Sequence, residues 1–164
     1  MRLRSLLDSA PPRRWPALPG RTNHLEAGVL VPLVWSDQPT ILAILRAADL
    51  RRHANEVAFP GGKPEPEDSD IVATALREAN EELGFDEVDV LGRLSSWPLY
   101  TSDYRLEPVV GVVHERQLVA DPGEVAEVLR FDVRAWLAHD TWRACPTTTT
   151  GSGGSRPSSS SMAT

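Results

Sequence analysis

The stretch from Phe59 to Phe85 constrains the fold of this 164-residue chain more than any other. Its second half predicts one amphipathic helix, because apolar residues recur at spacings of three and four and therefore share one face. That apolar stripe consists of Val72, Ala75, Leu76, Ala79 and Leu83. Gly84 predicts the end of the helix, where a left-handed cap favours glycine. Asp68, Ser69 and Asp70 are the candidate caps at its start, where carboxylates also suit the helix dipole.

The other side of the predicted helix carries three acidic residues in close succession. Glu78, Glu81 and Glu82 lie three or four residues apart or side by side, so their carboxylates project as neighbours, and Arg77 precedes them. Like charges at this spacing destabilise an isolated helix by a few tenths of a kcal/mol per pair. A divalent cation such as Mg²⁺ would compensate for that repulsion, since it prefers carboxylate oxygens. For an isolated E-x-x-E-E pattern, a solvated acidic face is the alternative.

The sequence around these acids resembles the Nudix box, in which a glycine and a loop precede R-E-(apolar)-x-E-E-x-G-(apolar). The residues that match in register are Arg77, Glu78, Ala79, Glu81, Glu82, Gly84 and Phe85. One departure is visible, because Gly62 lies one residue further from Arg77 than the common spacing. Ser69 then stands where the box has its first glutamate, with Asp68 just before it. An extra residue in the loop between strand and helix explains both differences.

The resemblance covers about residues 25–142 and implies an α/β fold of the Nudix type, an α/β/α sandwich around a mixed sheet. It also implies hydrolysis of a pyrophosphate bond in a nucleoside diphosphate derivative, with Mg²⁺ or Mn²⁺ as the cofactor. We expect Glu78, Glu81 and Glu82 to bind the metal. The catalytic assignments are Glu78, Glu81 and Arg77: one glutamate, by preference Glu78, orients or deprotonates the attacking water, and Arg77 holds a helix carboxylate in place.

A second pattern precedes the box, in the order L-x-R-x-x-x-L-R-x-H-x-x-E-V-x-F-P-G-G. It resembles the extension that marks the coenzyme A pyrophosphatase subgroup of Nudix hydrolases, although Asn55 stands where that subgroup prefers glycine. The resemblance implies that coenzyme A or its thioesters are cleaved to 3′,5′-ADP and 4′-phosphopantetheine. The expected substrate-binding residues are Arg46, Arg51, Arg52, His53, Gly61 and Gly62. ADP-ribose, dinucleotides and nucleoside triphosphates remain alternative substrates, and an inactive nucleotide-binding protein is the alternative of another class.

An acidic pair, Glu124 and Glu127, lies late in the chain. In the family that the box resembles, a carboxylate from this region often approaches the metal. An exposed charge on an edge strand is an equally good interpretation. Either Glu124 or Glu127 is therefore an auxiliary candidate ligand.

Composition limits the other function classes. A net charge of −6 argues against wrapping by nucleic acid, but it permits a local basic patch for a small phosphorylated ligand. Cys145 is the only cysteine, which excludes an internal disulfide and fits a reducing compartment. No apolar run reaches membrane-spanning length. We therefore expect a cytoplasmic protein whose partner is a small nucleotide substrate, with no nucleic acid and no membrane, and the oligomeric state stays open.

The chain divides into three parts by composition. Residues 1–24 are rich in arginine and proline and predict an extended arm. Residues 25–143 form the expected Nudix domain, with strands at 27–35, 40–45, 57–59, 88–99 and 108–114 and a helix that begins near Asp132. Residues 144–164 form a low-complexity tail, which we interpret as the product of a shifted reading frame, because Ser codons read one base out of phase become largely apolar. The domain would then lack its usual C-terminal helix, and we expect it to fold poorly or to associate through an exposed sheet face.

Overall fold

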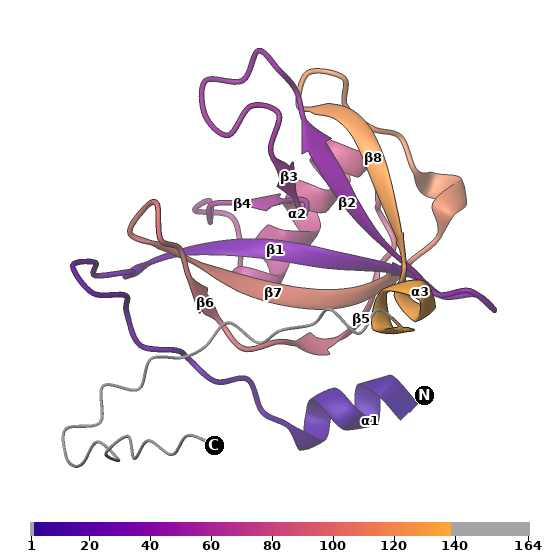
Figure 1. Cartoon of the computed structure of the whole chain (residues 1–164), viewed down its shortest axis with the longest axis horizontal. Helices are drawn as coiled ribbons and strands as arrows, with labels where there is room; N and C mark the ends of the chain where they lie inside the picture. Colours follow the sequence, from indigo (N-terminus) through magenta and orange to yellow (C-terminus); the bar gives the residue numbers. More distant parts are fainter. Residues whose placement is uncertain (1, 139–164) are drawn as a thin grey trace, which may run out of the picture.

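A mixed β-sheet forms the frame of the computed structural model, which describes residues 2–138 (Figure 1). The elements, in chain order, are α1 (Arg2–Ser9), β1 (Leu25–Val34), β2 (Thr40–Arg46), β3 (Val57–Ala58), β4 (Gly61–Gly62), α2 (Ile71–Leu83), β5 (Asp89–Arg93), β6 (Trp97–Pro98), β7 (Tyr104–Val113), the 3₁₀ turn η1 (Glu115–Gln117), β8 (Val125–Asp132) and α3 (Val133–Ala138). The predicted helix and the predicted strands are all present, with shifted ends. Residues 139–164, which include the tail at 144–164 and the place of a closing helix, lie outside the described residues.

The sheet is mixed, as predicted, because one of its ladders is parallel. The main order of strands is β3-β2-β1-β7-β5, with β4 pairing with β1, β6 with β7 and β8 with β2. β1 and β7 run parallel along their whole lengths, from the pair Leu25 and Tyr104 to the pair Val34 and Val113, and the other ladders are antiparallel. The predicted hairpin of β1 and β2 is confirmed. β1 is therefore a central strand.

Alternation along the strands sends one set of side chains to each face of the sheet. Leu30, Leu42 and Ile44 belong to a core that also contains Ala75, Ala79 and Leu83 of α2. Their neighbours along β1 and β2 lie on the opposite side, where a second cluster packs against α1. In the described part of the chain, the second helical layer of the sandwich consists only of the short helices α1 and α3. Much of that face is therefore left uncovered.

Several element boundaries differ from the sequence prediction. The strand expected at 88–99 is divided into β5 and β6, because the register of β5 shifts between Val90 and Gly92. The strand expected at 108–114 already begins at Tyr104, where it joins the long parallel ladder. β8 extends to Asp132, whose Oδ1 accepts a hydrogen bond of 2.9 Å from the Ala135 N–H, so the predicted helix start is confirmed.

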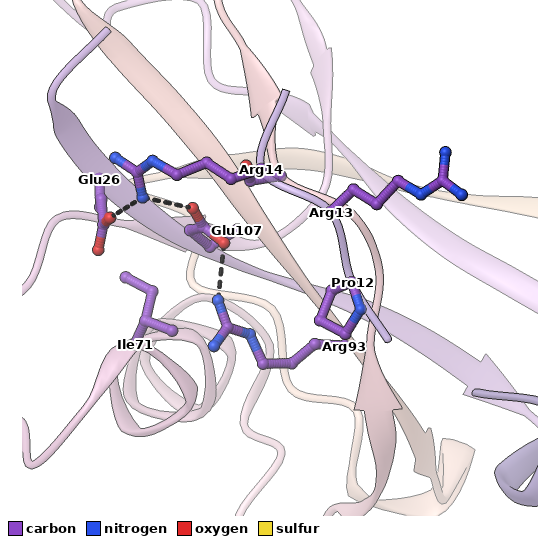
Figure 2. Close-up of a pocket in the computed structure, with 8 residues that line it drawn as sticks. Pro12, Arg13, Arg14, Glu26, Ile71, Arg93 and Glu107 are labelled. Carbon is purple, nitrogen blue, oxygen red and sulfur yellow. Dashed lines mark hydrogen bonds and ion pairs between the residues drawn. The ribbon is translucent and has the colours of Figure 1, made fainter. Parts of the chain in front are cut away.

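The N-terminal segment is bound to the sheet by polar contacts. Arg14 pairs with Glu26 at 2.6 Å and with the buried Glu107 at 3.7 Å, and Arg93 pairs with Glu107 at 2.7 Å. Figure 2 shows the Arg14 guanidinium between the two carboxylates, while Arg13 points away from them. These residues line a polar pocket of about 380 Å³. The ion pairs already occupy its charged groups, so they fix the segment to β1 and β7.

Buried polar groups continue this attachment. Asn23, which is 1% exposed, lies just before β1 and reaches across to the loop before β7. Arg105 is buried as well, and it donates to the Asn23 and Trp15 carbonyls and to the Ser96 hydroxyl at 2.9–3.0 Å. Residues 10–24 are mostly extended, as predicted, but α1 precedes them and their contacts make them part of the folded unit. No helix within residues 2–138 is both long and apolar enough to cross a membrane.

Candidate metal centre

Helix α2 has well-defined ends that set the direction of its acidic side chains. Asp70 is the N-cap, and its carboxylate accepts from the Ala73 N–H at 2.8 Å. Gly84 ends the helix in the left-handed conformation, with φ of 75°, and its N–H donates to the carbonyls of Ala79 and Asn80. Because the apolar stripe is packed against the sheet, the turns from Arg77 to Glu82 face the glycines of β4 and the end of β2.

Glu82 is the buried member of the acidic group, with only 2% of its surface exposed. One carboxylate oxygen accepts from the Gly61 N–H at 3.0 Å, and the other pairs with Arg46 Nη1 at 3.3 Å. Burial raises the pKa of Glu82 to about 7, although both of these partners act in the opposite direction. The charges of Glu124 and Glu78 add to the rise, which shows that several acids share this region. A positive charge in their midst would offset that repulsion.

Glu78 lies one turn before Glu82 and is largely buried. Its Oε1 accepts from Arg77 Nη2 at 3.0 Å, and its carboxylate lies against Gly62. A Cβ at Gly62 would collide with this carboxylate, so the absence of a side chain there makes the close approach possible. Burial raises the pKa of Glu78, Arg77 lowers it, and the charges of Glu81 and Glu124 raise it further.

Arg77 is the organising cation of the loop and helix. It donates to both oxygens of Asp68 at 3.1 and 3.2 Å, to the Lys63 carbonyl at 3.0 Å, and to Glu78 and Glu81 at 3.0 Å each. These hydrogen bonds raise the pKa of Arg77 and, chiefly through the Arg77 contact, lower the pKa of Asp68 to about 2. Thus Asp68, and not Ser69, is the loop residue that reaches Arg77. The changed spacing of the box therefore still delivers a carboxylate to Arg77.

The third predicted ligand, Glu81, is more exposed, and its carboxylate is held by Arg77. Within residues 2–138, no three acidic, histidine or cysteine side chains are gathered as a ready-made metal site. Arg77 and Arg46 hold the carboxylates of the acidic group instead. The donor set nevertheless suits a hard divalent cation, because it consists of carboxylate oxygens, two of them partly desolvated beside backbone glycines. The residues present therefore fit such an ion.

The structure distinguishes the two auxiliary candidates. The charge of Glu124 acts on the pKa of both Glu78 and Glu82, whereas that of Glu127 is absent from the causes of either shift. The Glu124 carbonyl also accepts from the Ala47 N–H at 2.8 Å, which joins this residue to the end of β2. Glu127 is an exposed residue of β8 opposite Leu45. Of the pair, Glu124 is the one that lies near the acidic group.

The predicted substrate residues are only partly brought together. Arg46 contacts Glu82, and its buried Nε has no hydrogen-bond partner among the described residues. Arg51 and Arg52 are exposed in the loop of residues 47–56, and His53 is turned to Glu56, with Nδ1 2.9 Å from the carboxylate. Asn55 adopts φ of 59°, so the left-handed conformation expected where the subgroup prefers glycine is confirmed.

Sequence analysis missed the positioning contact of Arg46 and favoured a direct role with substrate. The two partners, Arg46 and Glu82, come from different predicted elements, 36 residues apart. No local pattern signals such a pair. The only available signal was the choice of arginine at the last residue of a buried strand, where an unpaired charge would be costly.

Gly62→Ala tests the packing around Glu78. We expect at least tenfold lower turnover of a pyrophosphate substrate, because the new methyl group displaces the Glu78 carboxylate. The melting temperature should change little, since that carboxylate is the end of a flexible side chain. Gly123→Ala, where a methyl group would meet only the Asp121 side chain, is the matched control and should keep full turnover. Full activity in purified Gly62→Ala protein would contradict the placement of Glu78.

Comparison with known proteins gives the family. The family model described as "NUDIX domain" matches residues 24–147. A Nudix hydrolase NudL from Photorhabdus laumondii is 43% identical over 120 residues, which is 71% of this chain and 63% of that protein. NudL of Yersinia pestis is 48% identical over 95 residues, covering 56% of this chain and 46% of the relative. The chain thus spans about half to three fifths of the length of these relatives.

Solved structures agree on the fold. A NUDIX hydrolase from Nitrosomonas europaea superposes with a TM-score of 0.55 at 18% identity, covering 67% of this chain and 58% of that one. An Ap4A hydrolase from C. elegans gives 0.53 at 14% identity, covering 69% and 83%. At these identities the likeness concerns the fold, which confirms the predicted Nudix-type α/β architecture. Because the family model matches most of its length, the chain belongs to the Nudix family.

Proposed function

We propose that the chain is a metal-dependent hydrolase that cleaves the pyrophosphate bond of a nucleoside diphosphate derivative. The observation that carries the proposal is the group of Glu78, Glu82 and Glu124, which influence one another's charge beside Gly61 and Gly62. Nudix hydrolases generally need divalent metal ions, and we propose Mg²⁺ or Mn²⁺ here. Glu78, Glu81 and Glu82 would hold the ion, with Glu124 as the auxiliary ligand.

The ion, when bound, would neutralise phosphate charge and make water a better nucleophile. The residues of the chain account for the other requirements. Arg46 and the Gly61 N–H fix the orientation of Glu82. Glu78 would accept a proton from the attacking water, which adds to one phosphorus while the bridging P–O bond breaks and the second phosphate leaves. Arg77 is a positioning residue, because its contacts reach Asp68, Glu78 and Glu81.

For the substrate we propose coenzyme A or its thioesters, cleaved to 3′,5′-ADP and 4′-phosphopantetheine. The support is the order of residues before β4 and the position of the loop of residues 47–56. That loop starts at Ala47, which is hydrogen-bonded to Glu124, and it closes where the Asn55 N–H donates to the Arg46 carbonyl at 3.2 Å. Its exposed arginines, Arg51 and Arg52, are thus tethered beside the acidic group and available to phosphate. We propose that they bind the 3′-phosphate.

The test compares coenzyme A, dephospho-coenzyme A and ADP-ribose as substrates, each with Mg²⁺ and with Mn²⁺. Removal of the 3′-phosphate should lower kcat/KM by about 10- to 150-fold, the equivalent of one charge-assisted hydrogen bond of about 1.5–3 kcal/mol. A variant with both Arg51→Ala and Arg52→Ala should lose that discrimination and keep its activity on dephospho-coenzyme A. Arg116→Ala, in the η1 turn, is the control. A preference for ADP-ribose, dinucleotides or nucleoside triphosphates would refute the coenzyme A assignment and leave the hydrolase assignment intact.

A further inference from the structure

The face of the sheet opposite α2 carries two adjoining apolar hollows. One has a volume of about 460 Å³ and lies beside Leu6, Trp35 and Ile41; the other has about 210 Å³ and is lined by Ile41, Val57 and Phe131. We call the surface formed by these five residues the open face. Ile41 belongs to both hollows, so the two are parts of one surface. The alternation of β2 explains its position, since Leu42 and Ile44 face α2 and Ile41 faces away.

The open face exposes large apolar side chains side by side. Trp35 is 53% exposed, Val57 58% and Leu6 61%. Aromatic side chains carry roughly 150–250 Å² each. Together with the other exposed side chains around the hollows, the open face therefore presents on the order of 500 Å² of apolar area. A contiguous patch of this size is at the upper end of what a monomer exposes and is typical of an interaction surface.

The rest of the sequence does not supply a segment suited to cover it. After Trp142, the only large apolar residue of the chain is Met162, and threonine, serine and glycine predominate. A covering helix would need apolar residues at spacings of three and four, and this stretch has no such stripe. The side chains that match the open face in extent and character belong to the open face itself.

We propose that the open face is the interface of a homodimer, in which it packs against the open face of a second copy. A two-fold interface requires one surface that carries both projections and hollows, because each copy receives what it gives. Trp35 projects at the rim of the larger hollow. The apolar area, with the polar rim around it, approaches the roughly 800 Å² per partner of a standard interface. The acidic group is on the α2 side, so each copy keeps its own candidate site.

The test is sedimentation velocity of the full chain over about a hundredfold range of concentration. We expect a reversible dimer, and Trp35→Glu should weaken it at least tenfold because the carboxylate would be desolvated in the interface. Tyr100→Glu is the matched control, since Tyr100 is 82% exposed and lies outside both hollows; it should dimerise normally. Phe131→Glu is a second variant with the same expected loss.

Hydrogen exchange of the unmodified chain provides a measurement that does not depend on any variant. Backbone amides of β2 and β8 should exchange faster on dilution, because separation of the copies exposes the strands under the open face. A monomer at every concentration, with these amides protected throughout, would overturn the proposal in favour of a covering segment or another partner. A dimer that Trp35→Glu and Phe131→Glu leave unchanged would overturn it as well.

Discussion

Glu82→Gln is expected to lower turnover by roughly 10²–10³-fold, the equivalent of several kcal/mol of lost metal-ion stabilisation in the transition state. Glutamine has the same shape, and its carbonyl oxygen can still accept from the Gly61 N–H. A buried neutral amide is also easier to desolvate than a carboxylate whose pKa is raised to about 7 by burial. The metal-free variant should therefore be at least as stable as the original chain. Steady-state kinetics and thermal unfolding, each with and without Mg²⁺, measure the two effects.

The same experiment separates a catalyst from a binding module. In a catalyst, Glu82→Gln loses turnover and also the gain in melting temperature that Mg²⁺ gives by binding the folded state. Glu127→Gln is the matched control, because Glu127 is an exposed acid of β8, and it should leave both quantities unchanged. If the unmodified chain binds nucleotide with Mg²⁺ but shows no turnover for Glu82→Gln to reduce, the hydrolase proposal is wrong and an inactive nucleotide-binding role replaces it.

Asn23→Ala should destabilise the chain by about 2–4 kcal/mol, because it leaves several buried backbone groups without partners. The Asn23 side chain accepts from the Leu18 N–H and lies 3.0 Å from the carbonyls of Leu99, Ser102 and Tyr104, to which its amide donates. Asn23→Asp should be worse, since it places a carboxylate against three carbonyl oxygens. Denaturant unfolding at neutral pH measures both changes.

The control for this pair is Asn80→Asp, which introduces the same carboxylate at an exposed position of α2. It should change the free energy of unfolding by no more than about 0.5 kcal/mol. The comparison also tests the division of the chain at residue 24. If both Asn23 variants unfold like the original chain, the N-terminal segment is a separate arm and its contacts with the loop before β7 contribute little.

Local patterns predicted α2 and its surroundings well, because one periodicity and two capping rules determine them. Gly84 ends the helix in the left-handed conformation, and Asp70 proved to be the cap among the three candidates. The hairpin of β1 and β2 also follows from two apolar runs around a short turn. These features depend on neighbours along the chain, which is the information that a single sequence contains.

Contacts between distant segments could not be predicted in this way. Arg46 was assigned to the substrate, yet it contacts Glu82 from the end of another element. The N-terminal segment was expected to be an extended arm, but Arg105 and Asn23 bind it to the sheet through hydrogen bonds across more than 70 residues. Spacing predicts which side chains share a face. It does not predict which face of a distant element they meet.

The parallel ladder between β1 and β7 has a consequence for how the protein forms during its synthesis. Ten residues at the start of the domain pair with residues 104–113, so the longest ladder of the sheet closes a loop that contains most of the chain. Closing such a loop costs entropy before the new contacts compensate for it, which slows folding. On the ribosome, the first strand must therefore wait until residue 113 has left the exit tunnel. During that interval its valine- and leucine-rich segment is accessible to chaperones.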